Sequence, residues 1–259
     1  MSALLEIQGC SMDFGGLKAV DSLDIILEEG EMVALIGPNG AGKTTVFNVM
    51  TGVYQPTAGR ISFKGRSIKG MAPYLINRLG MARTFQNIRL FRNLSVLDNV
   101  ILGFNRQAQR NVFGTIFHSQ RFEEDRHEIL KRSHKLLDWM GLASMSESRS
   151  TDLPYGQQRR LEIARALATN PQLLLLDEPA AGMNLLEKRE LAHLIERLRK
   201  EFKLTIMIIE HDMKMVMQIC PRIVVLDYGK KIAEGGPSKI QNHPDVIEAY
   251  LGEKPILHG

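Results

Sequence analysis

The chain has 259 residues, of which 44% are hydrophobic and 24% charged, a composition typical of a globular protein with enough chain to bury a sizeable core. Its formal charge of +4 suits a phosphate-bearing ligand or an anionic lipid surface, but it is too small to indicate nucleic acid as a partner. No apolar run reaches the ~18 residues of a membrane span, and no charged-then-apolar leader opens the sequence, so we expect a chain that does not cross a membrane by itself.

Short strand patterns alternate with helical patterns along the chain. Residues 32–36 form a compact apolar run between two glycines, which is typical of a buried strand. From about residue 91 to residue 168 the pattern turns helical and more charged, and Ser95 is placed to cap a helix. Further strands are expected at 60–63, 173–176, 204–209 and 223–226, and helices at 44–50, 96–102, 123–140 and 185–200.

This order of elements predicts the fold class. Strands that alternate with helices favour a mainly parallel sheet with right-handed crossovers, so the class is α/β. The helical stretch, approximately 91–168, interrupts the alternation and is interpreted as a helical subdomain inserted into one core. Within it, residues 105–120 are polar with scattered aromatics and show no clear period.

A glycine-rich segment follows the first buried strand and opens a helix. It matches the pattern G-x-x-x-x-G-K-[ST], whose backbone N–H groups curl around phosphates at the positive end of a helix. Lys43 can reach the β- and γ-phosphates, and the Thr44 hydroxyl can bind Mg²⁺. Chance produces such a match in roughly one chain per hundred of this length, and the strand–loop–helix context makes chance less frequent still. The predicted phosphate-binding residues are Gly37, Pro38, Asn39, Gly40, Ala41, Gly42, Lys43, Thr44 and Thr45.

Two acids follow the apolar run 173–176. Because ligands of such folds collect at the carboxyl ends of parallel strands, Asp177 is placed to hold Mg²⁺ and Glu178 to polarise an attacking water. Taken alone, the pair could equally cap a helix. Together with the phosphate loop, it predicts a site of nucleotide hydrolysis.

Four further segments follow one another along the chain: 84–87 with Gln86, 153–160, 181–184, and 210–212 with His211. With these segments and the two motifs above, the sequence resembles, essentially end to end, the ATP-binding subunits of ABC transporters. Order and spacing of the motifs agree throughout. The resemblance implies an ABC ATPase fold over 1–259, a P-loop NTPase core with a mainly parallel sheet, an N-terminal antiparallel β region and the inserted helical subdomain. It also implies ATP and Mg²⁺ as cofactors. In that family, 84–87 corresponds to the Q-loop, 153–160 to the signature, 181–184 to the D-loop and His211 to the switch histidine.

The resemblance assigns roles that the residues alone leave open. It implies that Gln86 binds Mg²⁺ or water and responds to the permease, and that His211 contacts the γ-phosphate. Phe14 would stack on adenine with Val20 beside the sugar. Without the resemblance, Gln86 would be interpreted as structural and His211 as a surface or core histidine, and a plain core residue is the alternative for Phe14. The implied catalytic residues are Glu178, His211, Lys43 and Gln86; the Mg²⁺ ligands are Thr44, Gln86 and Asp177; Gly156 and Gln157 would contact the ATP of the opposite subunit.

A finer pattern resembles the LivG-type subunit of bacterial branched-chain amino acid importers. Segments 83–91, 178–184 and 246–252 carry this likeness, as does the insertion at 105–120. It implies a second, different ATPase subunit in a head-to-tail dimer, two integral-membrane permeases and a periplasmic solute-binding protein. It also implies a peripheral place on the cytoplasmic face of the inner membrane. Import of urea or short-chain amides is the alternative, because the solute contacts lie in other chains.

The sequence departs from the usual signature motif at one place, and two other classes of protein compete with the transporter interpretation. The usual signature has Ser and Gly where this chain has Pro154 and Tyr155, so the site that this chain completes on a partner's ATP is in question. Soluble ABC ATPases of translation or DNA repair carry two P-loops or a long coiled coil, whereas this chain has one P-loop and no sustained heptads. A small-molecule kinase would need neither a signature helix nor a switch histidine.

Overall fold

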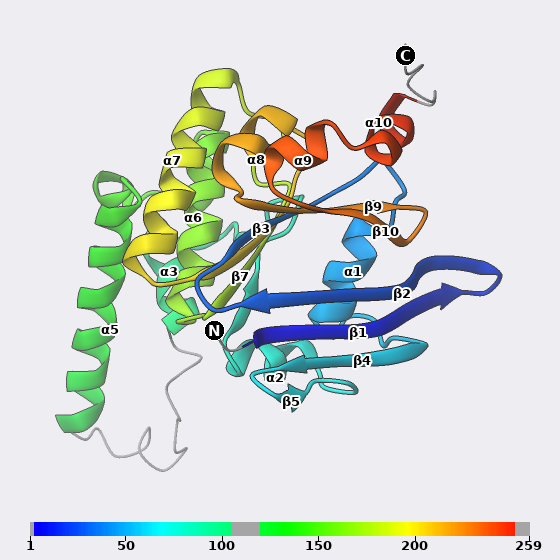
Figure 1. Cartoon of the computed structure of the whole chain (residues 1–259). Coiled ribbons are helices and arrows are strands. Elements are labelled where there is room, and N and C mark those ends of the chain that lie inside the picture. The colour runs from blue at the N-terminus through cyan, green and yellow to red at the C-terminus, as the bar shows by residue number, and fades with distance from the viewer. Residues whose placement is uncertain (1–2, 105–119, 252–259) are drawn as a thin grey trace. The chain divides into compact units, whose positions relative to one another are not determined.

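The computed structural model describes residues 3–104 and 120–251, coloured in Figure 1. The chain divides into two compact units, one made of Met1–Arg83 with Gln172–Gly259 and the other of Thr84–Pro171. The insertion at 105–120 lies outside the described residues except for Gln120. None of the helices in the described ranges is long and apolar enough to cross a membrane.

The first unit contains an antiparallel sheet built from the N-terminal part of the chain. Its strand order is β2-β1-β4-β5, with antiparallel pairing throughout. Residues of β2 alternate between buried and exposed from Leu23 to Leu27 because one face of this sheet packs on the core. The expected strand 60–63 falls within β4. The strands are β1 (Ala3–Phe14), β2 (Leu17–Glu28), β4 (Ala58–Phe63) and β5 (Arg66–Ser67).

A second, six-stranded sheet in the same unit carries the functional motifs. Its order is β10-β9-β3-β8-β7-β6, and all pairs are parallel except the β9–β10 hairpin. Every residue of β3, β7 and β8 is buried, which is why these strands read as unbroken apolar runs. The α/β class with an N-terminal antiparallel region is confirmed. The strands are β3 (Met32–Ile36), β6 (Met81–Arg83), β7 (Leu173–Asp177), β8 (Thr205–Ile209), β9 (Arg222–Asp227) and β10 (Lys230–Gly235).

The helices of this unit cover both faces of the six-stranded sheet. Figure 1 shows α1 on one side and α7 with α8 on the other. The core around α1 joins the two sheets, since Phe47 packs in one cluster with apolar residues of β1 and with alternate residues of β7 and β9. The helices are α1 (Lys43–Met50), α2 (Pro73–Arg78), α7 (Leu185–Glu201), α8 (Met213–Ile219), α9 (Pro237–Gln241) and α10 (Pro244–Leu251).

The second unit is helical in its described part. Gly103 of α3 packs against Ala168 of α6 so closely that a Cβ on the glycine would lie 2.6 Å from the alanine methyl group. Ser95 caps α3 as predicted, because its hydroxyl accepts the backbone N–H of Asp98 at 3.0 Å. The elements are α3 (Val96–Phe104), α5 (Gln120–Trp139), the 3₁₀ turns η1 (Ala143–Met145) and η2 (Ser150–Asp152), and α6 (Tyr155–Ala168).

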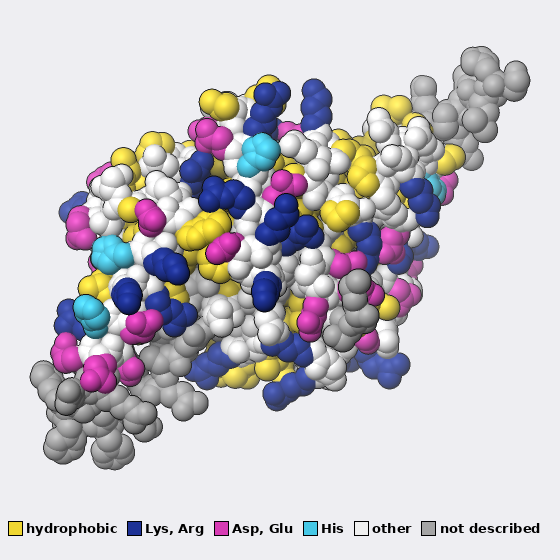
Figure 2. All heavy atoms as spheres, turned by 60° about the vertical axis from the view of Figure 1, so that its left-hand side comes forward, with side chains coloured by type: hydrophobic (Ala, Val, Ile, Leu, Met, Phe, Trp, Pro, Cys, Tyr) yellow, Lys and Arg dark blue, Asp and Glu magenta, His cyan; other side chains and the backbone are white. Residues whose placement is uncertain are grey.

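Charge on the surface is mixed. Figure 2 shows cationic and anionic side chains interspersed over the face that it draws, so the formal charge of +4 is not gathered there into one patch.

Candidate active site

The phosphate-loop glycines have backbone conformations that other residues rarely adopt. Gly42 has φ of 100°, and a Cβ there would collide with the carbonyl oxygen of Ala19. Gly37 has φ of 151°, and a Cβ there would collide with the carbonyl oxygen of Leu226. Both positions therefore require glycine for conformation and for space, independently of any ligand.

Lys43 lies at the start of α1 with its ammonium folded over the loop. Its Nζ donates to the carbonyl oxygens of Gly37 at 2.7 Å and Pro38 at 2.8 Å. Burial lowers the pKa of Lys43, while the charges of Glu178 and Asp177 oppose that shift. The two predicted acids are thus close enough to the lysine to interact with it electrostatically, as the prediction of a joint site requires.

Asp177 ends β7 and is held by an arginine that the sequence reasoning did not assign. Arg83 Nη2 lies 2.7 Å from Asp177 Oδ2, with side-chain exposures of 6% and 4%. The same guanidinium donates to Asn48 Oδ1 at 2.7 Å and lies over the Phe47 ring of α1. Arg83 ends β6, which pairs with β7. The sequence signal that could have identified this partner of Asp177 is a cationic residue at the end of the neighbouring strand, which is very short.

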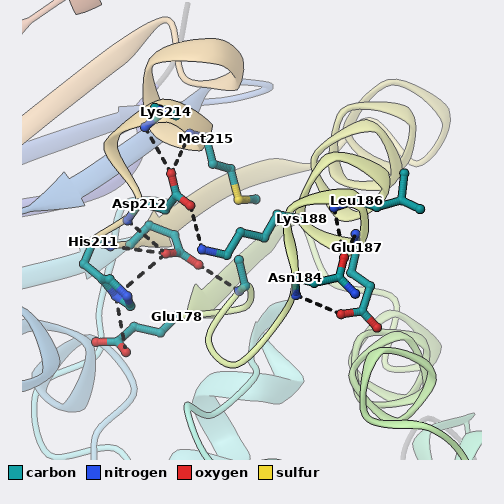
Figure 3. A network of polar contacts seen from close by, with 11 residues as sticks. Glu178, Asn184, Leu186, Glu187, Lys188, His211, Asp212, Lys214 and Met215 are labelled. Carbon is teal, nitrogen blue, oxygen red and sulfur yellow. Dashed lines mark hydrogen bonds and ion pairs between the residues drawn. The ribbon is translucent and has the colours of Figure 1, made fainter.

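Glu178 follows directly in a left-handed backbone conformation with φ of 44°. Its N–H donates to the carbonyl oxygen of Ile209 at 2.9 Å, which fixes the residue to the end of β8. Its carboxylate Oε2 lies 3.7 Å from Nδ1 of His211, and Figure 3 shows the two side chains pointing toward one another. The structure therefore brings together the predicted general base and the predicted switch histidine.

A buried carboxylate organises the backbone around this pair. Glu210 accepts the N–H of Ala180 at 2.8 Å and the N–H of its neighbour His211 at 3.2 Å. Burial raises the pKa of Glu210, and these backbone donors act against the rise. Glu210 thus ties the turn after β8 to the turn after β7, a role that the motif alone did not reveal.

Two helix caps extend the network in Figure 3. Asn184 begins α7 with a capping box, in which its side chain accepts from Glu187 N–H and the Glu187 carboxylate accepts from Asn184 N–H. Asp212 caps α8 and forms an ion pair with Lys188 of α7 at 2.7 Å. The pKa of Asp212 is lowered, chiefly by the hydrogen bond from Lys188. These contacts hold Asp212, the residue that follows His211, in place.

The predicted base and sugar contacts differ in exposure. Phe14 is 42% exposed, with its ring edge-on to Tyr54 at 5.1 Å between centroids, so it is not an ordinary core residue. Val20 is buried, and its side chain lines the same core as Ile7 and Leu23. In the phosphate loop and α1, Thr44 is exposed and Thr45 is half-buried.

The remaining predicted residues belong to the second unit. Gln86 is exposed in a segment without helix or strand. Gly156 and Gln157 lie in the first turn of α6, whose N-cap is Pro154. Gln157 already donates its N–H to the Pro154 carbonyl oxygen at 2.9 Å, whereas Gly156 has one of the helix-end N–H groups that lack an intrahelical acceptor.

Comparison with known proteins agrees with this geometry. The family model described as "ABC transporter" matches residues 20–181, and the model described as "Branched-chain amino acid ATP-binding cassette transporter" matches residues 230–255. The chain is 47% identical to the high-affinity branched-chain amino acid transport ATP-binding protein LivG of Salmonella typhimurium, over 96% of this chain and 98% of that one. It is 45% identical, with the same coverage, to the corresponding protein BraF of Pseudomonas aeruginosa.

Solved structures show the same likeness. An ATP-binding cassette of an ABC transporter in its ADP conformation has a TM-score of 0.84 at 28% identity, over 98% of this chain and all (100%) of that one. A nucleotide-free cassette has a TM-score of 0.83 at 29% identity, over 97% and 100% of the two chains. The chain therefore belongs to the ABC transporter family and is an ATP-hydrolysing subunit of its branched-chain amino acid group.

Proposed function

We propose that this chain hydrolyses ATP to drive the import of branched-chain amino acids. The observation that carries the proposal is identity of 45–47% to branched-chain amino acid transport ATP-binding proteins over nearly the whole length. The C-terminal match at 230–255 supports it independently of the ATPase motifs. Import of urea or a short-chain amide is the competing outcome for the experiment below.

Catalysis in this proposal uses the residues around the ends of β7 and β8. The segment 37–45 would hold the phosphates, with Lys43 neutralising their charge and Phe14 against the base. Glu178 would polarise the attacking water and His211 would contact the γ-phosphate. The 3.7 Å separation of Glu178 and His211 supports this pairing of roles. Most of the rate gain would come from positioning and charge stabilisation.

Magnesium fits the donor set of the first unit. Mg²⁺ prefers carboxylate and hydroxyl oxygens, and Asp177 and Thr44 provide one of each. The ion would neutralise charge on the phosphates. Arg83 would keep the Asp177 carboxylate ordered through their ion pair. Gln86, from the second unit, stays a predicted third ligand. Val20, whose side chain is buried, stays the predicted neighbour of the sugar.

Assembly follows the family pattern in this proposal. A second ATPase subunit would complete each nucleotide site, and Gly156 at the N-terminal end of α6 would face the partner's ATP with a backbone N–H that has no intrahelical acceptor. Gln157 would reach that ATP through its side chain, because its N–H is already bonded. Two integral-membrane permeases and a periplasmic binding protein would complete the importer, with this chain peripheral on the cytoplasmic face and no nucleic acid involved.

The test is solute-dependent ATP hydrolysis by a complex of this chain with two permeases, a second ATPase and a periplasmic binding protein from the same organism. Binding protein loaded with leucine, isoleucine or valine should stimulate phosphate release, while urea and acetamide should not. The Lys43→Ala variant of this chain is the control for hydrolysis by contaminants and by the partner ATPase. Stimulation by urea or acetamide alone would overturn the solute, and no stimulation by any solute would overturn the import function.

A further inference from the structure

The segment that contains Gln86 lacks regular structure, yet a buried arginine of α6 holds its backbone. Arg159 has 0% exposure. One of its Nη atoms donates to the carbonyl oxygen of Phe85 at 2.6 Å, and the other donates to the carbonyl oxygen of Gln86 at 2.7 Å. A planar guanidinium can satisfy both carbonyls at once, because its donors diverge in a fixed fork.

A buried glutamate on the same helix holds the donor groups of that segment. Glu162 Oε1 accepts the N–H of Arg89 at 3.1 Å and, more weakly, the N–H of Phe85 at 3.4 Å. Its other oxygen pairs with Arg159 at 2.7 Å. The two side chains, three residues apart on α6, thus bind carbonyl and N–H groups of residues 85–89 with opposite charges that also neutralise one another.

Tyr155 joins this pair from the first residue of α6. Its hydroxyl oxygen accepts from Arg159 at 3.2 Å, and its ring is 44% exposed. Tyr155 occupies the position at which the usual signature has glycine. A glycine has no side chain to reach Arg159, so this departure from the signature adds a contact between the signature and the residue that holds the Q-loop.

We propose that Tyr155, Arg159 and Glu162 form a clamp, here named the α6 clamp. The α6 clamp holds the backbone of residues 85–89 against the signature helix α6. As a result, the Q-loop and the signature move as one body. The transmission part rests on the proposed function: a permease that displaces Gln86 would displace Gly156 with it. Arg159 and Glu162 are positioning residues in this proposal, since they act on the Q-loop backbone and not on the nucleotide.

Amide hydrogen exchange on the full-length chain tests the clamp without any partner. In Arg159→Lys, exchange of the Phe85 and Arg89 amides should become faster by about tenfold or more, because the lysine cannot hold both carbonyls and Glu162 loses its fixed partner. Tyr155→Phe, which removes one hydroxyl, should give a smaller increase at the same amides. Arg165→Lys, on the same helix but stacked on the Phe91 ring at 5.2 Å, is the matched control. Unchanged exchange at Phe85 and Arg89 in Arg159→Lys overturns the clamp.

A double variant guards against a folding defect. Arg159→Met with Glu162→Met removes both charges together and leaves no buried carboxylate without a partner. If Arg159→Lys unfolds, this variant replaces it, and fast exchange confined to residues 85–89 supports the clamp. Fast exchange spread evenly over the whole of Thr84–Pro171 would show a general packing defect instead and would overturn it.

ATP hydrolysis by the assembled transporter tests transmission. In Tyr155→Phe the ratio of solute-stimulated to basal hydrolysis should fall by about three- to tenfold, while KM for ATP stays within about twofold. An unchanged ratio together with faster amide exchange would overturn transmission and leave the clamp. If wild type itself is not stimulated by any solute, the proposed import function fails and transmission with it, whereas the exchange result still decides the clamp.

Discussion

The two acids predicted to be catalytic and the predicted Q-loop are positioned by different means. Asp177 and Glu178 stand at the end of β7, whose residues are all buried and whose neighbours β6 and β8 pair with it in parallel register. Residues 84–91 have no helix or strand, and side chains of α6 and α3 hold their backbone. One site is set by a strand ladder and the other by buried polar side chains.

This difference explains which residues a sequence can reveal. A residue that follows a buried strand is placed by a pattern of a few neighbours, so the strand end predicts it. Arg159 and Phe85 are 74 residues apart in the chain, and Asn99 and Phe91 are 8 apart. Because such contacts leave no periodic trace, an irregular functional segment is found only through a known motif.

The largest expected effect comes from the strand-end site. Glu178→Gln should reduce turnover by about 10²–10⁴ and leave ATP affinity unchanged, because the amide keeps the shape but cannot act as a base. Phosphate release and nucleotide titration on the assembled complex measure the two quantities. Glu201→Gln, at the exposed end of α7, is the control. Turnover within threefold of wild type would remove Glu178 from the catalytic role.

The next effect concerns the arginine that the strand ladder brings to Asp177. Arg83→Met should lower the free energy of unfolding by about 3–5 kcal/mol, since it leaves the Asp177 carboxylate buried without its cation. Urea unfolding measures the change. Lys231→Met breaks a half-exposed pair with Glu234 and should cost about 1 kcal/mol or less. Equal losses in the two variants would mean that the Arg83 pair adds nothing beyond a surface contact.

Much of the fold follows from the sequence, and what does not has physical causes. The apolar runs 32–36, 173–176 and 223–226 were predicted as strands because both faces of the six-stranded sheet are covered. Strand β6 was missed, since three residues (Met81–Arg83) give no pattern, and the partner of Asp177 was missed with it. Glu210 was predicted only as a motif neighbour, because its acceptor role depends on the turn at Ala180.

A third variant, at Asn99, removes the side-chain contacts that hold the C-terminal end of the irregular segment 84–91. Asn99 is buried; its Oδ1 accepts the Phe91 N–H at 2.9 Å, and its Nδ2 donates to the Phe91 carbonyl oxygen at 3.1 Å. Asn99→Ala should cost about 1–3 kcal/mol, because the Phe91 N–H loses its acceptor and the Phe91 carbonyl oxygen keeps only the hydroxyl of Ser150. The single tryptophan, Trp139 in α5, reports unfolding of this unit by fluorescence.

The matched control lies in the same segment. Asn87 is exposed, so Asn87→Ala should change the free energy of unfolding by less than about 0.5 kcal/mol. If both alanine variants unfold at the same urea concentration as wild type, the segment is not held by Asn99. The comparison between strand-end and side-chain positioning would then rest on α6 alone.

The smallest effect is a pH dependence of stability at Asp212, beside the predicted switch histidine His211. Lys188 holds the pKa of Asp212 below its usual value of 3.8, across a pair with side-chain exposures of 27% and 20%. An acid whose pKa is depressed in the folded state adds stability above its unfolded pKa and loses it as pH falls through the folded one. Lys188→Met should therefore be less stable than wild type by about 0.3–1 kcal/mol at pH 7, and the gap should close below about pH 3.8. Lys214→Met is the control, because Lys214 contacts Asp212 through its backbone N–H. If the difference in stability between Lys188→Met and wild type stays constant down to pH 3, Lys188 acts through packing of its methylene chain. The charge of Lys188 would then not stabilise the network around His211.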